Sequence, residues 1–147
     1  MARELREFEE RRRVGFGYSL RGEEIKKASN LRSVMQQLPS LIVGPRVVRT
    51  PIVVRGDIVL PASGDVHDAE APGTFNVYMR RDAIGSAYCL ANLYVDGIKS
   101  YWEQLGGYKP EDIAGVEVYP RQSLVPIRFQ DISSGCGVVL VWTKSLR

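Results

Sequence analysis

The stretch that decides the fold is Gly137-Val138-Val139-Leu140-Val141-Trp142-Thr143-Lys144, near the end of the 147-residue chain. Its apolar run is nearly continuous, which is typical of a central strand covered on both faces. No part of the sequence reaches the roughly 18 consecutive apolar residues that a membrane-spanning helix needs. We therefore expect this strand at the middle of a sheet, in a chain that does not cross a membrane by helix.

The segment before this strand has the pattern of a short turn that leads into a second strand. Pro110 fits the first turn of a helix, and Ile113 follows it closely. In the alternating run Val116-Glu117-Val118-Tyr119, the two valines are expected to bury one face while Glu117 points away from it. Earlier still, Asp96-Gly97 follows an apolar run and predicts a tight turn between two strands.

The rest of the chain adds strands and short helices. Leu31, Val34, Met35 and Leu38 have helical spacing, with Asn30 as N-cap and Pro39 as the stop. We expect an α+β domain, in which a small mixed β-sheet is covered by short helices. Its strands are predicted at residues 47–54, 75–80, 87–95, 114–119 and 137–143. Residues 1–18 are interpreted as an N-terminal helix and extended lead-in, and residues 19–147 as the single globular domain.

Four segments, in this order, resemble the plug domain of TonB-dependent outer-membrane receptors. The first is a helix that ends at Leu38-Pro39, and the second is a strand end with Val95-Asp96-Gly97. The residues that match in the third and fourth segments are Pro110, Ile113, Glu117 and Val118, and then Gly137, Trp142 and Thr143. Between the third and fourth segments, Pro120-Arg121 and Phe129-Gln130 replace residues that are usual in the family.

The resemblance implies a non-catalytic domain that occludes or gates an outer-membrane barrel, in its own or a separate chain. A TonB-type energiser and an unknown ligand or protein would be the partners, and no cofactor is expected. The matching residues then serve the fold and do no chemistry. The location implied is the periplasmic face of the outer membrane. The first residues do not form a secretory signal peptide, so the chain would be cytoplasmic if Met1 is its native start.

Cys89 and Cys136 lack the spacing of a zinc or redox site, which leaves either one disulfide or two buried thiols. The periplasmic location that the resemblance implies favours a bridge. Closing that loop would stabilise the domain by about 4 kcal/mol in the chain-entropy treatment.

The long segment at residues 61–73 contains the only histidine, His67, flanked by Asp65 and Asp68. These residues are candidates for a ligand or partner loop. A histidine base with a carboxylate would suit an enzyme, but no nucleophile accompanies them, and one histidine cannot complete a metal cluster with the cysteines. We therefore predict no catalysis and no metal.

Two alternatives to the plug function remain at this point. One is a free-standing periplasmic module that binds a ligand or a protein. The other is a nucleic-acid-binding domain that uses arginine-rich strands and the Arg11-Arg12-Arg13 cluster. A net charge of +3, with acidic residues interleaved among the basic ones, argues against nucleic acid as a partner.

Overall fold

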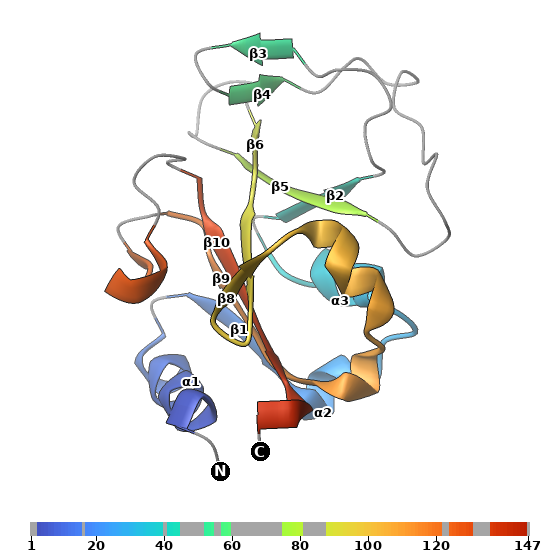
Figure 1. The fold of residues 1–147 in the computed structure, drawn as a ribbon, viewed down its shortest axis with the longest axis vertical. Helices are drawn as coiled ribbons and strands as arrows, with labels where there is room; N and C mark the ends of the chain where they lie inside the picture. The colour runs from blue at the N-terminus through green and yellow to red at the C-terminus, as the bar shows by residue number, and fades with distance from the viewer. Residues whose placement is uncertain are drawn as a thin grey trace.

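The computed structural model describes residues 3–15, 17–39, 41–44, 52–54, 57–59, 75–80, 88–121, 124–130 and 136–146. Within these ranges the chain forms two five-stranded sheets and several short helices (Figure 1). The predicted α+β class is therefore confirmed.

The first sheet, here called sheet A, is mixed. Its strand order is β1 (Tyr18–Arg21), β9 (Ile113–Tyr119), β10 (Val138–Thr143), β7 (Asn92–Val95) and β8 (Ile98–Ser100). The β10 and β7 strands are parallel, and all other neighbours in sheet A are antiparallel. The strand predicted as central is the middle one of the five, and all six of its residues are buried.

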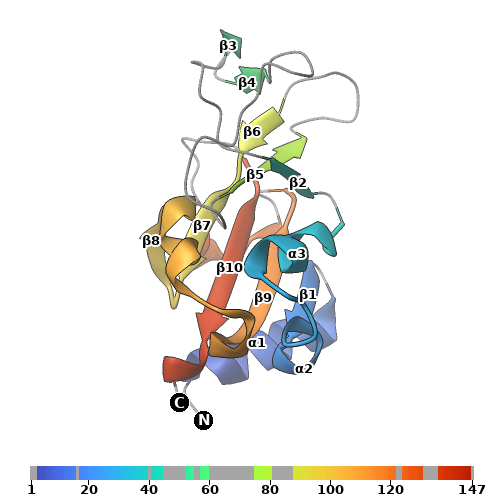
Figure 2. The same cartoon turned by 90° about the vertical axis from the view of Figure 1, so that its right-hand side faces the viewer.

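The second sheet, sheet B, is antiparallel throughout and extends beyond one end of sheet A (Figures 1 and 2). Its order is β2 (Leu41–Gly44), β5 (Asn76–Arg80), β6 (Tyr88–Leu90), β4 (Asp57–Val59) and β3 (Ile52–Val54). The sequence predicts one small sheet, whereas the structure divides its strands between two.

The two sheets join where the chain passes from β6 to β7. The amide of Ala91 donates to the carbonyl of Val77 in sheet B at 2.9 Å, and the next amide, of Asn92, donates to the carbonyl of Gly137 beside sheet A at 3.1 Å. The segment predicted as one strand over residues 87–95 thus changes partners at its middle. This change divides the strands into two sheets.

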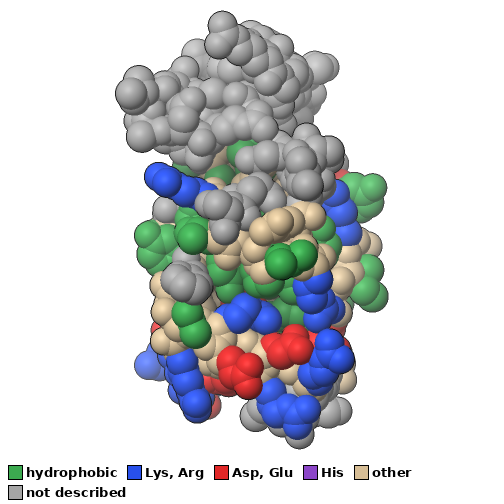
Figure 3. Space-filling view, turned by 90° about the vertical axis from the view of Figure 1, so that its left-hand side faces the viewer, with side chains coloured by type: hydrophobic (Ala, Val, Ile, Leu, Met, Phe, Trp, Pro, Cys, Tyr) green, Lys and Arg blue, Asp and Glu red, His purple; other side chains and the backbone are tan. Residues whose placement is uncertain are grey.

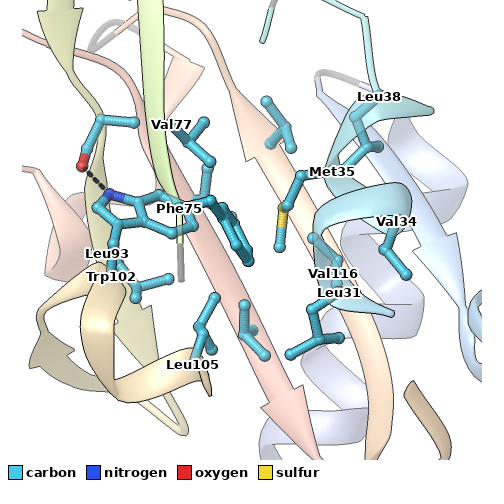
Figure 4. Packing of buried hydrophobic residues seen from close by; sticks show 14 of the residues in the cluster. Leu31, Val34, Met35, Leu38, Phe75, Val77, Leu93, Trp102, Leu105 and Val116 are labelled. Carbon is cyan, nitrogen blue, oxygen red and sulfur yellow. Dashed lines mark hydrogen bonds between the residues drawn. The ribbon is translucent and has the colours of Figure 1, made fainter. Parts of the chain in front are cut away.

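One face of sheet A, the inner face, carries the larger apolar core. It is covered by α2 (Gly22–Ile25), α3 (Leu31–Gln36) and the 3-10 helix η1 (Trp102–Gly107). Figure 4 shows the α3 side chains and the rings of Phe75 and Trp102 meeting above the sheet. The indole N–H of Trp102 donates to the carbonyl of Ala91 at 2.8 Å, so η1 is anchored where the two sheets join.

The opposite face of sheet A, the outer face, is covered by α1 (Arg3–Val14) and by the segment that contains η4 (Ile127–Phe129). The side chains that pack together there are Leu5, Phe8, Tyr119, Val125, Phe129, Val138, Leu140 and Trp142. Covering on both faces explains why β10 is apolar at every position from Val138 to Trp142.

Three local predictions from the sequence are confirmed. The side chain of Asn30 accepts a hydrogen bond from the amide of Ser33 at 2.8 Å and so caps α3, which ends before the buried Leu38 and the exposed Pro39. Asp96 and Gly97 have φ values of 53° and 86°, so they form the tight turn between β7 and β8. Pro110 begins the short 3-10 helix η2 (Pro110–Asp112), which runs directly into β9.

Cys89 and Cys136 form a disulfide, with Cα atoms 5.9 Å apart. Cys89 lies on β6 of sheet B, while Cys136 lies just before β10 of sheet A. Both residues are buried. The bridge therefore ties the two sheets together at their junction.

Across the described ranges, no helix combines the length and the apolar character that crossing a membrane requires. The longest of them, α1, has 12 residues and is mostly charged. A final 3-10 helix, η5 (Lys144–Leu146), ends the described part of the chain near α1 (Figure 1).

Candidate functional site

The most unusual group in the structure is a buried carboxylate, Glu117, on the outer face of sheet A. The residue is only 1% exposed. Its side chain lies on the opposite side of β9 from Val116 and Val118, as the alternation predicts. That side is also buried, because α1 covers it. The alternating pattern does not reveal this second layer, so the burial of Glu117 is a finding of the structure.

Glu117 accepts hydrogen bonds from three side chains. Arg11 of α1 binds it with two nitrogens, Nε to Oε1 at 2.7 Å and Nη2 to Oε2 at 2.9 Å. The Tyr119 hydroxyl donates to Oε1 and the indole N–H of Trp142 donates to Oε2, each at 2.6 Å. This fully bonded arrangement is what a buried charge requires, since an unpaired carboxylate in such a place would be strongly unfavourable.

The charges in this cluster reinforce one another. Burial alone would lower the pKa of Arg11, but its hydrogen bond and charge attraction to Glu117 raise that pKa above its ordinary value. Burial and the negative charge of Glu117 raise the pKa of the Tyr119 hydroxyl well above its usual range. Arg11 therefore stays a cation and Tyr119 stays a neutral donor at any physiological pH.

The spacing of side chains along helix α1 places Arg11 over the sheet. Leu5, Phe8 and Arg11 recur every three residues, so they lie along one side of the helix. Leu5 and Phe8 are buried. The guanidinium carbon of Arg11 lies 5.8 Å from the centre of the Trp142 ring, which adds a cation–π contact to the ion pair.

Weaker ion pairs surround this contact. Glu9 of α1 lies 3.3 Å from Arg21 of β1, and Glu7 lies 3.6 Å from Arg128 of η4. Both arginines are about half exposed at the side chain, 51% and 46% respectively. Exposed pairs of this kind contribute little to stability, so the buried residues hold the helix in place.

A groove of about 390 Å³ runs beside α1. Glu10, Arg11 and Val14 of the helix form one wall, and Tyr119, Leu124 and Pro126 form the other. Figure 3 shows hydrophobic side chains on this face of the molecule, interspersed with basic and acidic ones. A mainly apolar groove that ends at a few polar groups is the usual form of a binding site, and Arg11 and Tyr119 supply those groups here.

A second groove, of about 340 Å³, lies on the other flank of α1. It is lined by Leu5, Phe8, Glu9, Arg21, Gly22, Glu23, Lys26, Ala114 and Lys144. Four of its charged side chains pair with one another, Lys26 with Glu23 at 2.8 Å and Arg21 with Glu9 at 3.3 Å. We therefore regard the first groove, together with the Glu117 cluster, as the candidate site.

Other residues singled out in the sequence form a structural contact of their own. The carboxylate of Asp96 accepts hydrogen bonds from the amide and the hydroxyl of Thr143, at 2.8 and 2.6 Å. The turn after β7 is thereby tied to the end of β10. The backbone of Asp96, with its positive φ, forms the predicted turn, while its side chain binds the neighbouring strand.

The remaining predicted residues are dispersed. Val95, Ile113, Val118, Gly137 and Trp142 are all buried in sheet A or beside it. Asp65, His67 and Asp68 lie outside the described residues. In the part of the chain that the structure describes, no group of three or more histidine, cysteine, aspartate or glutamate side chains could hold a metal ion.

Sequence reasoning missed Arg11 and Tyr119 as members of a cluster. The signal for Arg11 was the three-residue spacing that continues the line of Leu5 and Phe8. For Tyr119, the signal was its position two residues after Glu117 on one strand, which places both side chains on the same face.

Comparisons with known proteins show where a similar fold occurs. No protein-family model matches the sequence, and no curated protein matches it. Among solved structures, a chain of the RagAB peptide importer in its open-open state is similar, with a TM-score of 0.54 and 18% sequence identity. The match covers 88% of this chain and 12% of that chain. At this identity the likeness concerns the fold alone.

Proposed function

We propose that this chain is a non-catalytic, plug-type domain of a TonB-dependent outer-membrane receptor, which occludes or gates a barrel and offers a surface to a ligand or partner. The observation that carries the proposal is the fold shared with a chain of a peptide importer over 88% of the present chain. The same match spans only 12% of that longer chain, as expected for one small domain of a large transport protein.

The positions of the plug-like motifs support this proposal. Three of the four segments supply strands or turns of sheet A, namely the β7–β8 turn, β9 and β10. Their polar groups act within the domain: Asp96 binds Thr143, and the Asp112 side chain accepts from the amide of Lys109 at 2.9 Å. Such residues maintain the shape of the domain. A plug needs nothing more, because it acts by filling a barrel and by being displaced from it.

The disulfide supports the proposed location at the periplasmic face of the outer membrane. Disulfides form and persist in the bacterial periplasm but are rare in reducing compartments. The partners we propose are an outer-membrane barrel, in the same or a separate polypeptide, and a TonB-type energiser. A ligand or protein would bind through the exposed grooves and loops.

Cell fractionation tests the proposal. An antibody raised against the purified chain is used on the native cells, after separation of cytosol, periplasm, inner membrane and outer membrane. We expect the epitope in the outer-membrane fraction, within a larger polypeptide or bound to one, and accessible to protease only after the outer membrane is permeabilised. Recovery in the cytosol would overturn the proposal, and recovery free in the periplasm would favour a stand-alone binding module instead.

Nucleic-acid binding is tested separately, because two members of the arginine cluster already have acidic partners. Arg11 binds Glu117, and Arg12 lies 3.3 Å from Glu9. We expect no retention of labelled oligonucleotides at low salt. Tight binding that weakens steeply with ionic strength would favour the nucleic-acid alternative, because phosphate contacts release counterions.

A further inference from the structure

The outer face of sheet A has the features of a site for an arginine-bearing helix. Its acceptor is the Glu117 carboxylate, whose side chain is 2% exposed. Tyr119 and Trp142 hold this carboxylate from within the sheet, each at 2.6 Å, so two of the side chains that position it belong to the sheet and not to α1. The site is therefore built by the sheet, and α1 supplies only the occupant.

The contact is specific for arginine. A guanidinium can bind both oxygens of a carboxylate at once while its flat face lies near an aromatic ring, and a lysine ammonium cannot reproduce the two-point geometry. Arg11 makes both contacts, with Glu117 and with Trp142. The buried residues that precede it on the same side of the helix, Leu5 and Phe8, add an apolar part to the recognition.

The helix is built as a separable piece. It ends at Val14, and the φ of 80° at the next residue, Gly15, turns the chain out of the helix. No atoms lie within 4 Å of where a Cβ of Gly15 would be. Most other side chains of α1 are charged, so the helix can stand in water when it leaves the sheet. The groove of about 390 Å³ leaves one flank of the helix open as far as Arg11 and Tyr119.

We infer that the outer face of sheet A is a docking site for an amphipathic helix with Leu, Phe and Arg at three-residue spacing, which α1 occupies as a releasable latch. The occupant that replaces it is the α1 helix of a second copy of this chain. Release alone would expose the Glu117 carboxylate and the apolar side chains that Leu5 and Phe8 cover. The α1 helix of a second copy restores both contacts, because it carries the same leucine, phenylalanine and arginine. This inference does not depend on the proposed function.

Peptide exchange on the full chain tests the inference. The probe is a fluorescent, acetylated and amidated peptide with the sequence of residues 3–14, and anisotropy measures its binding. The chain variant Phe8→Ala weakens its own latch but leaves the sheet untouched. We expect the peptide to bind this variant about tenfold more tightly than the wild-type chain. If Phe8→Ala does not fold, Leu5→Ala provides a second weakened latch.

Variants of the peptide probe distinguish specific docking from nonspecific binding. A peptide with Arg11→Gln is expected to bind the Phe8→Ala chain about tenfold more weakly, because it loses the two-point contact. This preference should vanish when the chain also carries Glu117→Gln. A Gly115→Ala chain is a negative control, since a Cβ there would overlap the Phe8 ring of any docked helix.

Two results would overturn the inference. One is absence of peptide binding to folded Phe8→Ala and Leu5→Ala chains, which would show that the site accepts no helix in trans. The other is equal binding of the wild-type and Arg11→Gln peptides, which would show that Glu117 does not recognise the arginine. Neither readout depends on the compartment or the barrel, so failure here is distinct from failure of the plug proposal.

Discussion

Glu117 is a charge enclosed between a sheet and a helix, and its cation, Arg11, belongs to the helix. Removing one member of a buried pair costs more than the pair contributes, because the remaining charge stays buried without compensation. A substitution of Arg11 alone should therefore change the free energy of unfolding measurably. We expect Arg11→Met to lower the free energy of unfolding by about 3 kcal/mol, as seen by urea denaturation of the oxidised protein.

Two further variants show whether the buried charge is the cause. The double variant Arg11→Met/Glu117→Gln removes the charge but keeps an amide that can serve Tyr119 and Trp142, so it should recover most of the loss. Arg6→Met, at an exposed position on the same helix, should change the stability by less than about 0.5 kcal/mol. If the double variant is no more stable than Arg11→Met alone, the explanation by an unpaired charge is wrong.

Tyr119 makes the free energy of unfolding decrease as the pH becomes alkaline. Burial and the charge of Glu117 raise the pKa of its hydroxyl in the folded protein. In the unfolded chain the same hydroxyl ionises with the ordinary tyrosine pKa of about 10. Above that pH the unfolded chain releases a proton that the folded chain retains, so unfolding becomes easier. The stabilising contribution is complete below about pH 10 and is lost as the pH rises towards the folded pKa.

Comparison of wild type with Tyr119→Phe isolates this contribution. The free energy of unfolding of the wild-type chain should fall more steeply between about pH 9.5 and 11 than that of the variant, because other tyrosines and the lysines titrate in both. The measurement is a series of denaturant titrations across this range. Parallel curves for the two proteins would contradict the assignment.

At the level of elements, the sequence patterns predicted most strands and turns but not the layer formed by α1. The apolar run of β10 indicated cover on both faces, and the central position of that strand is confirmed. Helix α1 offers only two buried apolar residues, Leu5 and Phe8, so its pattern predicts a short, mostly exposed helix with modest docking. An ion pair between residues 106 positions apart completes its docking, and no local pattern encodes such a contact.

Gly115 of β9 allows α1 to dock, which gives a test at this scale. A Cβ at Gly115 would meet the Phe8 ring, with Cζ at 2.6 Å, so the ring must move away from the sheet. We expect Gly115→Ala to destabilise the protein by about 1–2 kcal/mol and to abolish protection of the α1 amides in hydrogen exchange. The amides of β10 should stay protected.

Gly22→Ala is the matched control, because it also adds a methyl group against β9. Its nearest atoms would be backbone carbonyl oxygens at 3.5 Å, which is ordinary contact. This variant should leave the exchange of α1 unchanged. Equal loss of protection in the two variants would mean that α1 does not depend on the Phe8 contact.

At the level of the whole molecule, the sequence predicted most of the strands, though not β1, β2 or β4, and it did not predict their division into two sheets. The run at residues 87–95 has the pattern of one strand, and that local pattern does not reveal that Ala91 and Asn92 donate to different sheets. This change of hydrogen-bond partner depends on which distant strands lie beside residues 87–95. The local patterns in the sequence do not give that strand order. The two cysteines were the one feature of the sequence that indicated a link between distant parts of the chain, and they form that link as a disulfide.

The disulfide spans the junction of the sheets, so its removal tests how far the domain depends on that link. It connects residues 47 positions apart, and in the chain-entropy treatment a loop of this length contributes about 4 kcal/mol. A domain of this size is stable by only about 5–15 kcal/mol in total. We expect Cys89→Ala/Cys136→Ala, or reduction of the wild type, to lower the urea midpoint by a large fraction. Dithiothreitol should have no effect on the double variant. A stability change below about 1 kcal/mol would show instead that the hydrogen bonds around Ala91 and the η1 anchor at Trp102 are sufficient to hold the two sheets together.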